Sequence, residues 1–293
     1  MIQRVTAVPR PPDRADDAHK GDFGRVLVLA GSRGMAGAAA LCGLGALRGG
    51  AGLVTVATPA CCADAVTAVE PGLMTHPIPD GNTGCVPHPG LDRWLTDVLE
   101  TPHDVIAVGC GLGRGNGITA AVKRIAGESE KPVVVDADGL NALGSPPGFL
   151  PTAAAPRVFT PHAGEFARLL GPNVTAKDVQ ADREDLAVRF AGDFGLVLLL
   201  KGHRTLVTDG DRLFTNRTGN PGMATGGAGD VLTGLLAALI GQGMPPFEAA
   251  CCAAHLHGRA GDLAAAALSR PGLIASDLPR YIAKAFADPA FPE

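Results

Sequence analysis

The segment 220–230 is a glycine-rich loop that runs directly into an apolar segment at 231–240, and it is the part of the sequence best suited to chemistry. Its glycines, Gly226, Gly227 and Gly229, let a ligand approach the main chain closely, and we expect Gly229 to adopt a positive φ. Because the first amides of a helix have no partner within it, they direct free N–H groups and the positive end of the helix dipole toward the loop. The pattern predicts an anion site, most often one for phosphate.

Asp230 stands where this loop meets the helix. A carboxylate fixed beside a bound phosphate can take the proton from a hydroxyl that attacks the phosphoryl group. The alternative is a plain helix start, in which Asp230 only complements the helix dipole. The loop and its aspartate alone leave both interpretations open.

Other unusual residues also follow apolar runs that we predict to be strands. Small residues follow two of these runs, at 31–39 and 109–113, and they indicate either a surface against which a ligand packs or simply tight turns. Asp136 and Asp138 end a third run, and their carboxylates suit a hydrated magnesium ion or a ribose. The alternative there is a strand-to-helix turn with Asp138 as the N-cap.

Two basic side chains complete this set. His162 follows the run 157–160 and precedes Glu165 by three residues, so it is either a hydrogen-bonding or acid–base group or a histidine at a helix start. Lys201 ends the run 196–201, which indicates either a phosphate contact or a lysine that extends its stem to solvent. His255 and His257 are two residues apart on one predicted helix and should face different sides, so we do not expect a metal pair.

The elements that must position these side chains alternate along the chain. Continuous apolar runs predict buried strands, at 25–30, 53–58, 105–108, 132–136, 157–160 and 196–201. Helices are expected at 37–47, 60–69, 117–126, 163–170, 178–193, 246–268 and 276–286, besides the one after Asp230. The segments 205–208 and 212–215 predict an antiparallel hairpin. The fold class is therefore α/β, a three-layer α/β/α domain with a mostly parallel sheet and an antiparallel edge hairpin, in which ligands gather at the carboxyl ends of the strands.

Composition narrows the function classes. The chain has 293 residues, of which 46% are hydrophobic and 18% charged, a balance typical of a globular enzyme. With a formal net charge of −4, one Trp and one Tyr, it offers neither a basic surface nor aromatic platforms for nucleic acid. No apolar run is long enough to span a bilayer and the N-terminus lacks a signal-peptide core, so we expect a soluble cytoplasmic protein with no membrane partner.

The seven cysteines do not indicate a disulfide framework. The adjacent pairs Cys61–Cys62 and Cys251–Cys252 cannot easily form disulfides or a metal knuckle. We expect all four to be small apolar core residues in a reducing compartment.

The order of the motifs is more specific than any one of them. From about Lys20 to the C-terminus, the chain resembles the ADP-dependent NAD(P)H-hydrate dehydratases, a family with the ribokinase-like fold. The resemblance is carried by Lys20-Gly-Asp-Phe-Gly, Ala30-Gly-Ser, Gly111-Leu-Gly113, Asp136-Ala-Asp138, Thr160-Pro-His-Ala-Gly-Glu165, Lys201-Gly-His-Arg-Thr205 and Gly219 to Asp230. It implies an N-terminal arm at 1–19 and one dehydratase domain at 20–293, with no fused epimerase domain.

The resemblance also implies roles for individual residues. Asp230 would be the catalytic base. The hydrated nicotinamide nucleotide would be contacted by Ala38, Ala39, Gly113, His162 and Asp230. The adenine nucleotide, ADP or AMP, would be held by Lys201, Gly202, His203, Arg204, Thr205, Thr225, Gly227 and Gly229. No metal ligand is certain, because Mg²⁺ would be held through the nucleotide phosphates and water.

The implied reaction dehydrates the S form of NADH hydrate and NADPH hydrate, with ADP as co-substrate, and yields NADH or NADPH, AMP and phosphate. This activity is that of a hydro-lyase in nucleotide repair. The resemblance further implies a homotetramer and a separate epimerase as functional partner. Two positions depart from the family pattern: Cys110 and Ala163 each stand where a proline is usual. We expect looser local backbone there, without the loss of a functional side chain.

Three alternatives stay open at this stage. A small-molecule kinase of the same fold would share the chemistry around Asp230 but leave the phosphate on its product. A Rossmann dehydrogenase is disfavoured because the glycines after the first strand do not form Gly-x-Gly-x-x-Gly. A non-catalytic nucleotide-binding protein is disfavoured by the intact Asp230.

Overall fold

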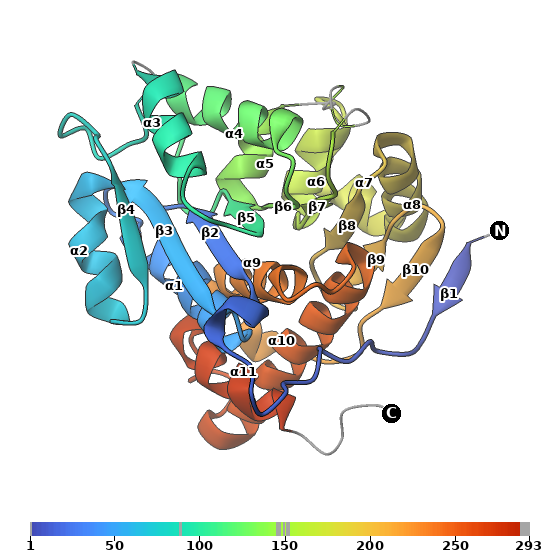
Figure 1. The fold of residues 1–293 in the computed structure, drawn as a ribbon. Helices are drawn as coiled ribbons and strands as arrows, with labels where there is room; N and C mark the ends of the chain where they lie inside the picture. Colours follow the sequence, from blue (N-terminus) through green and yellow to red (C-terminus); the bar gives the residue numbers. More distant parts are fainter. Residues whose placement is uncertain (1, 88–89, 145–147, 149, 151–152, 288–293) are drawn as a thin grey trace.

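The computed structural model describes residues 2–87, 90–144, 148, 150 and 153–287. Within them, a twisted sheet runs through the centre of the molecule (Figure 1). Its strands, in the order β1-β10-β9-β8-β7-β6-β5-β2-β3-β4, are β1 (Gln3–Val5), β10 (Arg212–Thr215), β9 (Leu206–Thr208), β8 (Val197–Leu200), β7 (Arg157–Phe159), β6 (Val133–Val135), β5 (Val105–Val108), β2 (Arg25–Leu29), β3 (Leu53–Pro59) and β4 (Met74–Ile78).

The sheet is parallel except around β9, which runs antiparallel to both β8 and β10. This confirms the predicted hairpin and the mostly parallel sheet. Beyond the hairpin, β1 adds in parallel to β10, with Gln3 opposite Arg212. The segment that we expected to be an arm thus contributes a short strand.

Helices cover both faces of the sheet (Figure 1). One layer is formed by α3 (Leu91–Leu99), α4 (Asn116–Glu128), α5 (Ala137–Leu143), α6 (Ala163–Leu170), α7 (Ala176–Ala181) and α8 (Arg183–Phe194). The other layer contains α1 (Ala36–Arg48), α2 (Ala60–Val69), α9 (Ala228–Gly241), α10 (Pro246–Leu268) and α11 (Leu278–Phe286). Short 3₁₀ turns lie at Lys20–Phe23, Pro221–Met223 and Ala275–Asp277.

Alternate residues of the central strands supply two hydrophobic cores. On β2, Val26 and Val28 pack against the layer that contains α1 and α9, while Leu27 and Leu29 pack against the layer that contains α4. Because both faces are covered, all residues of β5 and β6 are buried. This confirms the three-layer α/β/α fold that the continuous apolar runs predicted.

Two local expectations were wrong. The helix expected at 178–193 is broken at Asp182, whose backbone leaves the helical region with φ −138° and ψ 50°. The break places Arg183 at the start of α8, where its guanidinium donates to the Leu200 carbonyl at the end of β8 and to the His203 carbonyl in the loop after it. Cys61 is exposed, because it faces away from the core on α2, whereas Cys62, Cys251 and Cys252 are buried as expected.

Some elements were not predicted at all, namely β1, β4 and α3, and α5 was considered only as the alternative in which a helix starts at Asp138. None of the helices in the described part of the chain combines the length and the apolar content that crossing a bilayer requires.

Candidate functional site

The N-terminus of α9 lies at the carboxyl edge of the sheet and is left open. Gly227 occupies the N-cap position with φ 96°, and no side chain caps the helix. A Cβ at Gly227 would also lie 2.5 Å from Leu41 Cδ1, so this position requires glycine for both conformation and space. The first-turn amides of α9 therefore have no side-chain acceptor and are available to an anion.

Gly229 has a different role from the one expected. It is the second residue of α9, and the left-handed φ of this segment belongs to Gly227, so the positive φ expected at Gly229 was wrong. Its lack of a side chain instead keeps space open beside a charged pair. A Cβ there would lie 3.2 Å from Lys201 Nζ and 3.7 Å from Asp136 Oδ2.

This pair is the electrostatic centre of the site. Lys201 Nζ lies 2.6 Å from Asp136 Oδ1 and 3.8 Å from Glu165 Oε2. Thr233 donates its hydroxyl to Asp136 Oδ2 at 2.7 Å, so both oxygens of this carboxylate are engaged. Burial lowers the pKa of Lys201, but the Asp136 and Glu165 carboxylates outweigh it and raise the pKa above its usual value. Lys201 is therefore a fixed, fully charged ammonium beside the start of α9.

Asp230 lies beside this pair in the first turn of α9. Burial, followed by repulsion from Asp136, raises the pKa of Asp230 to about 6. A base is most effective when its pKa lies near the working pH, because it is then ionised and still basic enough to take a proton. Asp230 has this property, as a general base near neutral pH requires.

The thiol of Cys110, which stands where the motif usually has a proline, also belongs to this cluster. One ligand atom each from Cys110, Asp136 and Asp230 lies within 4.8 Å of the others. The neighbouring Cys42 thiol and burial raise the pKa of Cys110 well above its usual value, which keeps the thiol protonated. Because Asp136 already binds Lys201 and Thr233 and the Cys110 thiol is protonated, Asp230 is the member of this cluster best able to offer an oxygen to a hard cation.

His162 caps helix α6. Its Nδ1 accepts from the amides of Gly164 at 3.0 Å and Glu165 at 3.2 Å, and its own amide donates to Glu165 Oε2 at 2.8 Å. These bonds confirm the interpretation of His162 as a histidine at a helix start. Because Nδ1 accepts, the neutral ring carries its proton on Nε2, and the side chain is 55% exposed. Glu165 connects His162 to Lys201.

The loop after β5 forms a surface of small residues. Gly111 lies against Ala38, since a Cβ at Gly111 would be 2.8 Å from Ala38 Cβ. Ala38 is half-buried, whereas Ala39 is fully buried and faces the core, which leaves Ala38 as the accessible member of the two. The amide of Gly113 donates to Asp138 Oδ2 at 2.8 Å.

That bond also decides the role of Asp138. Asp138 lies in the first turn of α5 and Asp136 holds the N-cap position, with no side-chain cap. The N-cap alternative for Asp138 was therefore wrong. Its carboxylate instead ties the loop after β5 to the start of α5.

The segment 201–205 forms a tight turn after β8. Gly202 has φ +144° and Arg204 has φ +54°. Arg183 Nη1 donates to the His203 carbonyl at 2.7 Å and thereby holds the turn from outside. The side chains of His203 and Arg204 are exposed, so among these residues only Lys201 reaches the charged centre. Thr225 lies just before α9, where its carbonyl accepts from the Ala228 amide at 3.4 Å.

The two histidines of α10 face different sides, as expected. His257 Nε2 lies 2.9 Å from the Ala228 carbonyl, and burial lowers the pKa of His257 to about 4. It is thus a neutral donor beneath the start of α9. His255 instead lines a separate cavity beside β1 and β10.

This combination of a three-layer sheet, an uncapped helix start and a buried lysine–carboxylate pair defines the class. The fold is ribokinase-like: a ribokinase-like superfamily protein from Enterococcus faecalis superposes with a TM-score of 0.76 at 27% identity, covering 97% of this chain and 96% of that one. Residues 26–284 match the family model described as NAD(P)H-hydrate dehydratase. The chain belongs to this family.

Individual relatives agree with this assignment. The chain is 44% identical over 268 residues to a bifunctional NAD(P)H-hydrate repair enzyme of Moorella thermoacetica, covering 91% of this chain but 50% of that protein. It is 39% identical to an ADP-dependent (S)-NAD(P)H-hydrate dehydratase of Neisseria meningitidis, covering 90% and 85%. The Bacillus subtilis ADP/ATP-dependent NAD(P)H-hydrate dehydratase, co-crystallised with ATP/Mg²⁺, superposes with a TM-score of 0.80 at 31% identity, covering 95% and 94%. The chain thus spans about half the length of the bifunctional relatives.

Proposed function

We propose that this chain dehydrates the S forms of NADH hydrate and NADPH hydrate, with ADP as phosphoryl donor, and that it returns NADH or NADPH together with AMP and phosphate. The names of the relatives support the reaction class. The observation that carries the proposal is the uncapped start of α9, with Asp230 in its first turn and the Lys201 ammonium beside it.

The terminal phosphate of ADP would bind at the first amides of α9 and near Lys201. Backbone amides and an ammonium stabilise the charge that develops during phosphoryl transfer, and they do so without reorganising. A Mg²⁺ ion bound to the nucleotide would neutralise phosphate charge there. Gly227, Gly229, Thr225 and the turn 201–205 would form the nucleotide side of the site.

Asp230 would take the proton from the ring hydroxyl of the hydrate. The hydroxyl oxygen then bonds to the terminal phosphorus of ADP, and the bond from that phosphorus to AMP breaks. Phosphate is a far better leaving group than hydroxide. The ring nitrogen lone pair therefore expels it, and loss of a proton from the adjacent ring carbon regenerates the dihydronicotinamide. Ala38, Gly113 and His162 would hold the hydrate, with Ala39 supporting Ala38 from the core.

The remaining parts of the proposal concern the bounds of the catalytic domain, its cellular location, its oligomeric state and its functional partner. The segment 20–293 would be the catalytic domain, acting as a cytoplasmic homotetramer. An epimerase would be its functional partner by supplying the S form, in line with the bifunctional repair enzymes among its relatives.

The test is incubation of the protein with NADH hydrate, ADP and Mg²⁺, with absorbance at 340 nm and AMP release followed together. We expect absorbance to recover with one AMP formed per NADH. Formation of a phosphorylated product without recovery of absorbance would instead identify a small-molecule kinase.

A further inference from the structure

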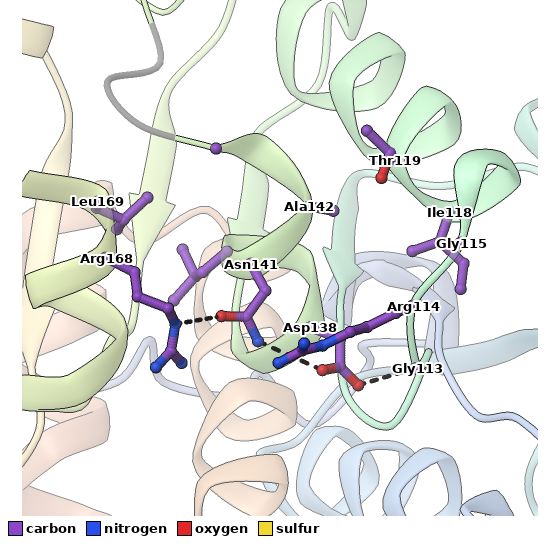
Figure 2. A pocket seen from close by; sticks show the side chains of 12 residues that line it. Gly113, Arg114, Gly115, Ile118, Thr119, Asp138, Asn141, Ala142, Arg168 and Leu169 are labelled. Atoms are coloured by element: carbon purple, nitrogen blue, oxygen red, sulfur yellow. Dashed lines mark hydrogen bonds between the residues drawn. The ribbon is translucent and has the colours of Figure 1, made fainter. Parts of the chain in front are cut away.

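A pocket of about 290 Å³ opens beside the loop after β5, and of its lining residues only Gly113 has a part in the chemistry described above. It is lined by the loop after β5, by the first turn of α4, by α5 and by Arg168 and Leu169 of α6. Figure 2 shows Arg114 and Arg168 on either side of Asp138 and Asn141. The polar lining thus combines two guanidinium groups, one carboxylate and one amide.

A chain of hydrogen bonds fixes this lining. Arg168 Nε donates to Asn141 Oδ1 at 2.8 Å, and Asn141 Nδ2 donates to Asp138 Oδ1 at 3.4 Å. The amide of Gly113 donates to the other Asp138 oxygen. Arg168 is therefore oriented through its Nε, which leaves its two Nη groups as donors toward the pocket.

The positive charges of the two pocket arginines are not paired with a carboxylate among the described residues. Asp138 accepts through both oxygens, and in the part of the chain that the structure describes neither Arg114 nor Arg168 forms an ion pair. Two exposed guanidinium groups facing one cavity are a fork-shaped donor set that matches phosphate oxygens. Both Asp138 oxygens and Asn141 Oδ1 already accept one hydrogen bond each, and each keeps a second lone pair for a ribose hydroxyl.

We propose that this pocket binds the ribose–diphosphate part of the dinucleotide substrate, with Arg114 and Arg168 on the diphosphate. The inference rests on the proposed function and extends it to the non-reacting half of the substrate. The pocket adjoins Gly113, which lies on the substrate side of the site, and it is built from segments that follow β5, β6 and β7. The nucleotide elements lie elsewhere, after β8 and at the start of α9.

The test compares Arg114→Ala and Arg168→Ala with Arg189→Ala, which removes the same charge from an exposed position on α8 outside the pocket. A lost charge-assisted hydrogen bond weakens binding by about tenfold or more. We expect each pocket variant to raise the KM for NADH hydrate by about this factor, with kcat and the KM for ADP nearly unchanged. Arg189→Ala should match wild type.

Two further substrates identify the part of the dinucleotide that Arg114 and Arg168 contact. The hydrate of reduced nicotinamide mononucleotide lacks the diphosphate, so its KM should change much less in the pocket variants. An unchanged KM for NADH hydrate would overturn the proposal. So would an effect confined to NADPH hydrate, which would assign the arginines to the 2′-phosphate, or a raised KM for ADP, which would assign the pocket to the other nucleotide.

An equilibrium titration with NADH separates this inference from the proposed function. Weaker NADH binding by the two pocket variants than by Arg189→Ala would support the subsite even if the wild-type protein failed to restore absorbance at 340 nm. Equal NADH binding by all three variants would overturn the subsite while leaving the dehydratase assay unaffected.

Discussion

Helices α6 and α9 begin at the same edge of the sheet with similar first turns, but they treat their free amides in opposite ways. Each starts with alanine, glycine and an acidic residue, at 163–165 and 228–230. In α6, His162 accepts from two first-turn amides and Glu165 accepts from the His162 amide. In α9 the N-cap is Gly227 and no side chain accepts. The N-cap residue therefore decides which helix start is closed and which is open to a ligand.

The two acidic residues differ in the same way. Glu165 is used by its own helix and by Lys201, at 3.8 Å. Asp230 caps nothing, and burial beside Asp136 raises its pKa to about 6. The acidic residue of α6 is thus structural, while that of α9 is available for proton transfer.

The largest effect should come from Asp230→Asn. The amide keeps the shape of the side chain but cannot accept the proton, so turnover should fall by about 10² to 10⁴. ADP affinity should change little, and Glu165→Gln should cost far less turnover. Retention of more than about a tenth of wild-type turnover would remove Asp230 from this role.

The next largest effect should come from Lys201→Met. This change leaves Asp136 buried without its cation, which typically costs about 3 to 5 kcal/mol of unfolding free energy. Urea unfolding measures the loss. The double variant with Asp136→Asn removes the uncompensated charge and should recover part of it. Equal stability of the single and double variants would show that the pair is not coupled in the way the 2.6 Å contact indicates.

The pH profile should follow Asp230. Its pKa is raised to about 6, so the carboxylate is ionised above that pH and protonated below it. We therefore expect kcat/KM, which reports the ligand-free enzyme, to be level above about pH 7 and to fall toward about tenfold per pH unit below about pH 5. Initial rates measured below the KM of the substrates test this. A profile that stays flat down to about pH 4.5 would contradict the assignment of Asp230 as the base.

The smallest effect should come from His162→Ala. Loss of an N-cap costs about 0.5 to 2 kcal/mol of unfolding free energy. We expect weaker binding of the hydrate as well, because the half-exposed His162 ring is a proposed hydrate contact, and little change for ADP. His162→Asn is the matched control, because asparagine can cap α6 but lacks the ring, so it should restore stability without restoring hydrate affinity. Loss of ADP affinity alone would mean that the two ligand sides are reversed.

The fold was largely predictable because its strands are continuous apolar runs buried on both faces. Elements without that signal were missed. Edge strand β4 contains His76 and Pro77 and exposes Met74, so it lacks the pattern of a buried strand. The break at Asp182 was also missed, and it brings Arg183 to the start of α8, where its guanidinium donates to the His203 carbonyl, a contact over 20 positions that no local pattern indicates.

The site was predictable as a set of residues but not as a geometry. The glycines and Asp230 could be selected because their types suit phosphate and proton transfer. The Lys201–Asp136 contact joins residues 65 positions apart, and no local pattern indicates it. The pocket was not predictable for the same reason, because Arg114 and Arg168 are far apart in the sequence and line one cavity only in the folded chain.

The most direct test of the open helix start is calorimetric titration of ADP into Gly229→Ala and Gly164→Ala. Both glycines are second residues of their helices, where alanine favours the helix by about 0.5 to 1 kcal/mol. A Cβ at Gly229 would lie 3.2 Å from Lys201 Nζ and one at Gly164 would lie 3.0 Å from His162 Cε1, so each variant displaces one neighbouring side chain and its unfolding free energy is measured alongside. Only the neighbour of Gly229 belongs to the proposed phosphate site. We predict that Gly229→Ala weakens ADP binding by about tenfold or more and that Gly164→Ala leaves it unchanged. Wild-type affinity in Gly229→Ala, or an equal loss in both variants, would contradict a phosphate site at the start of α9.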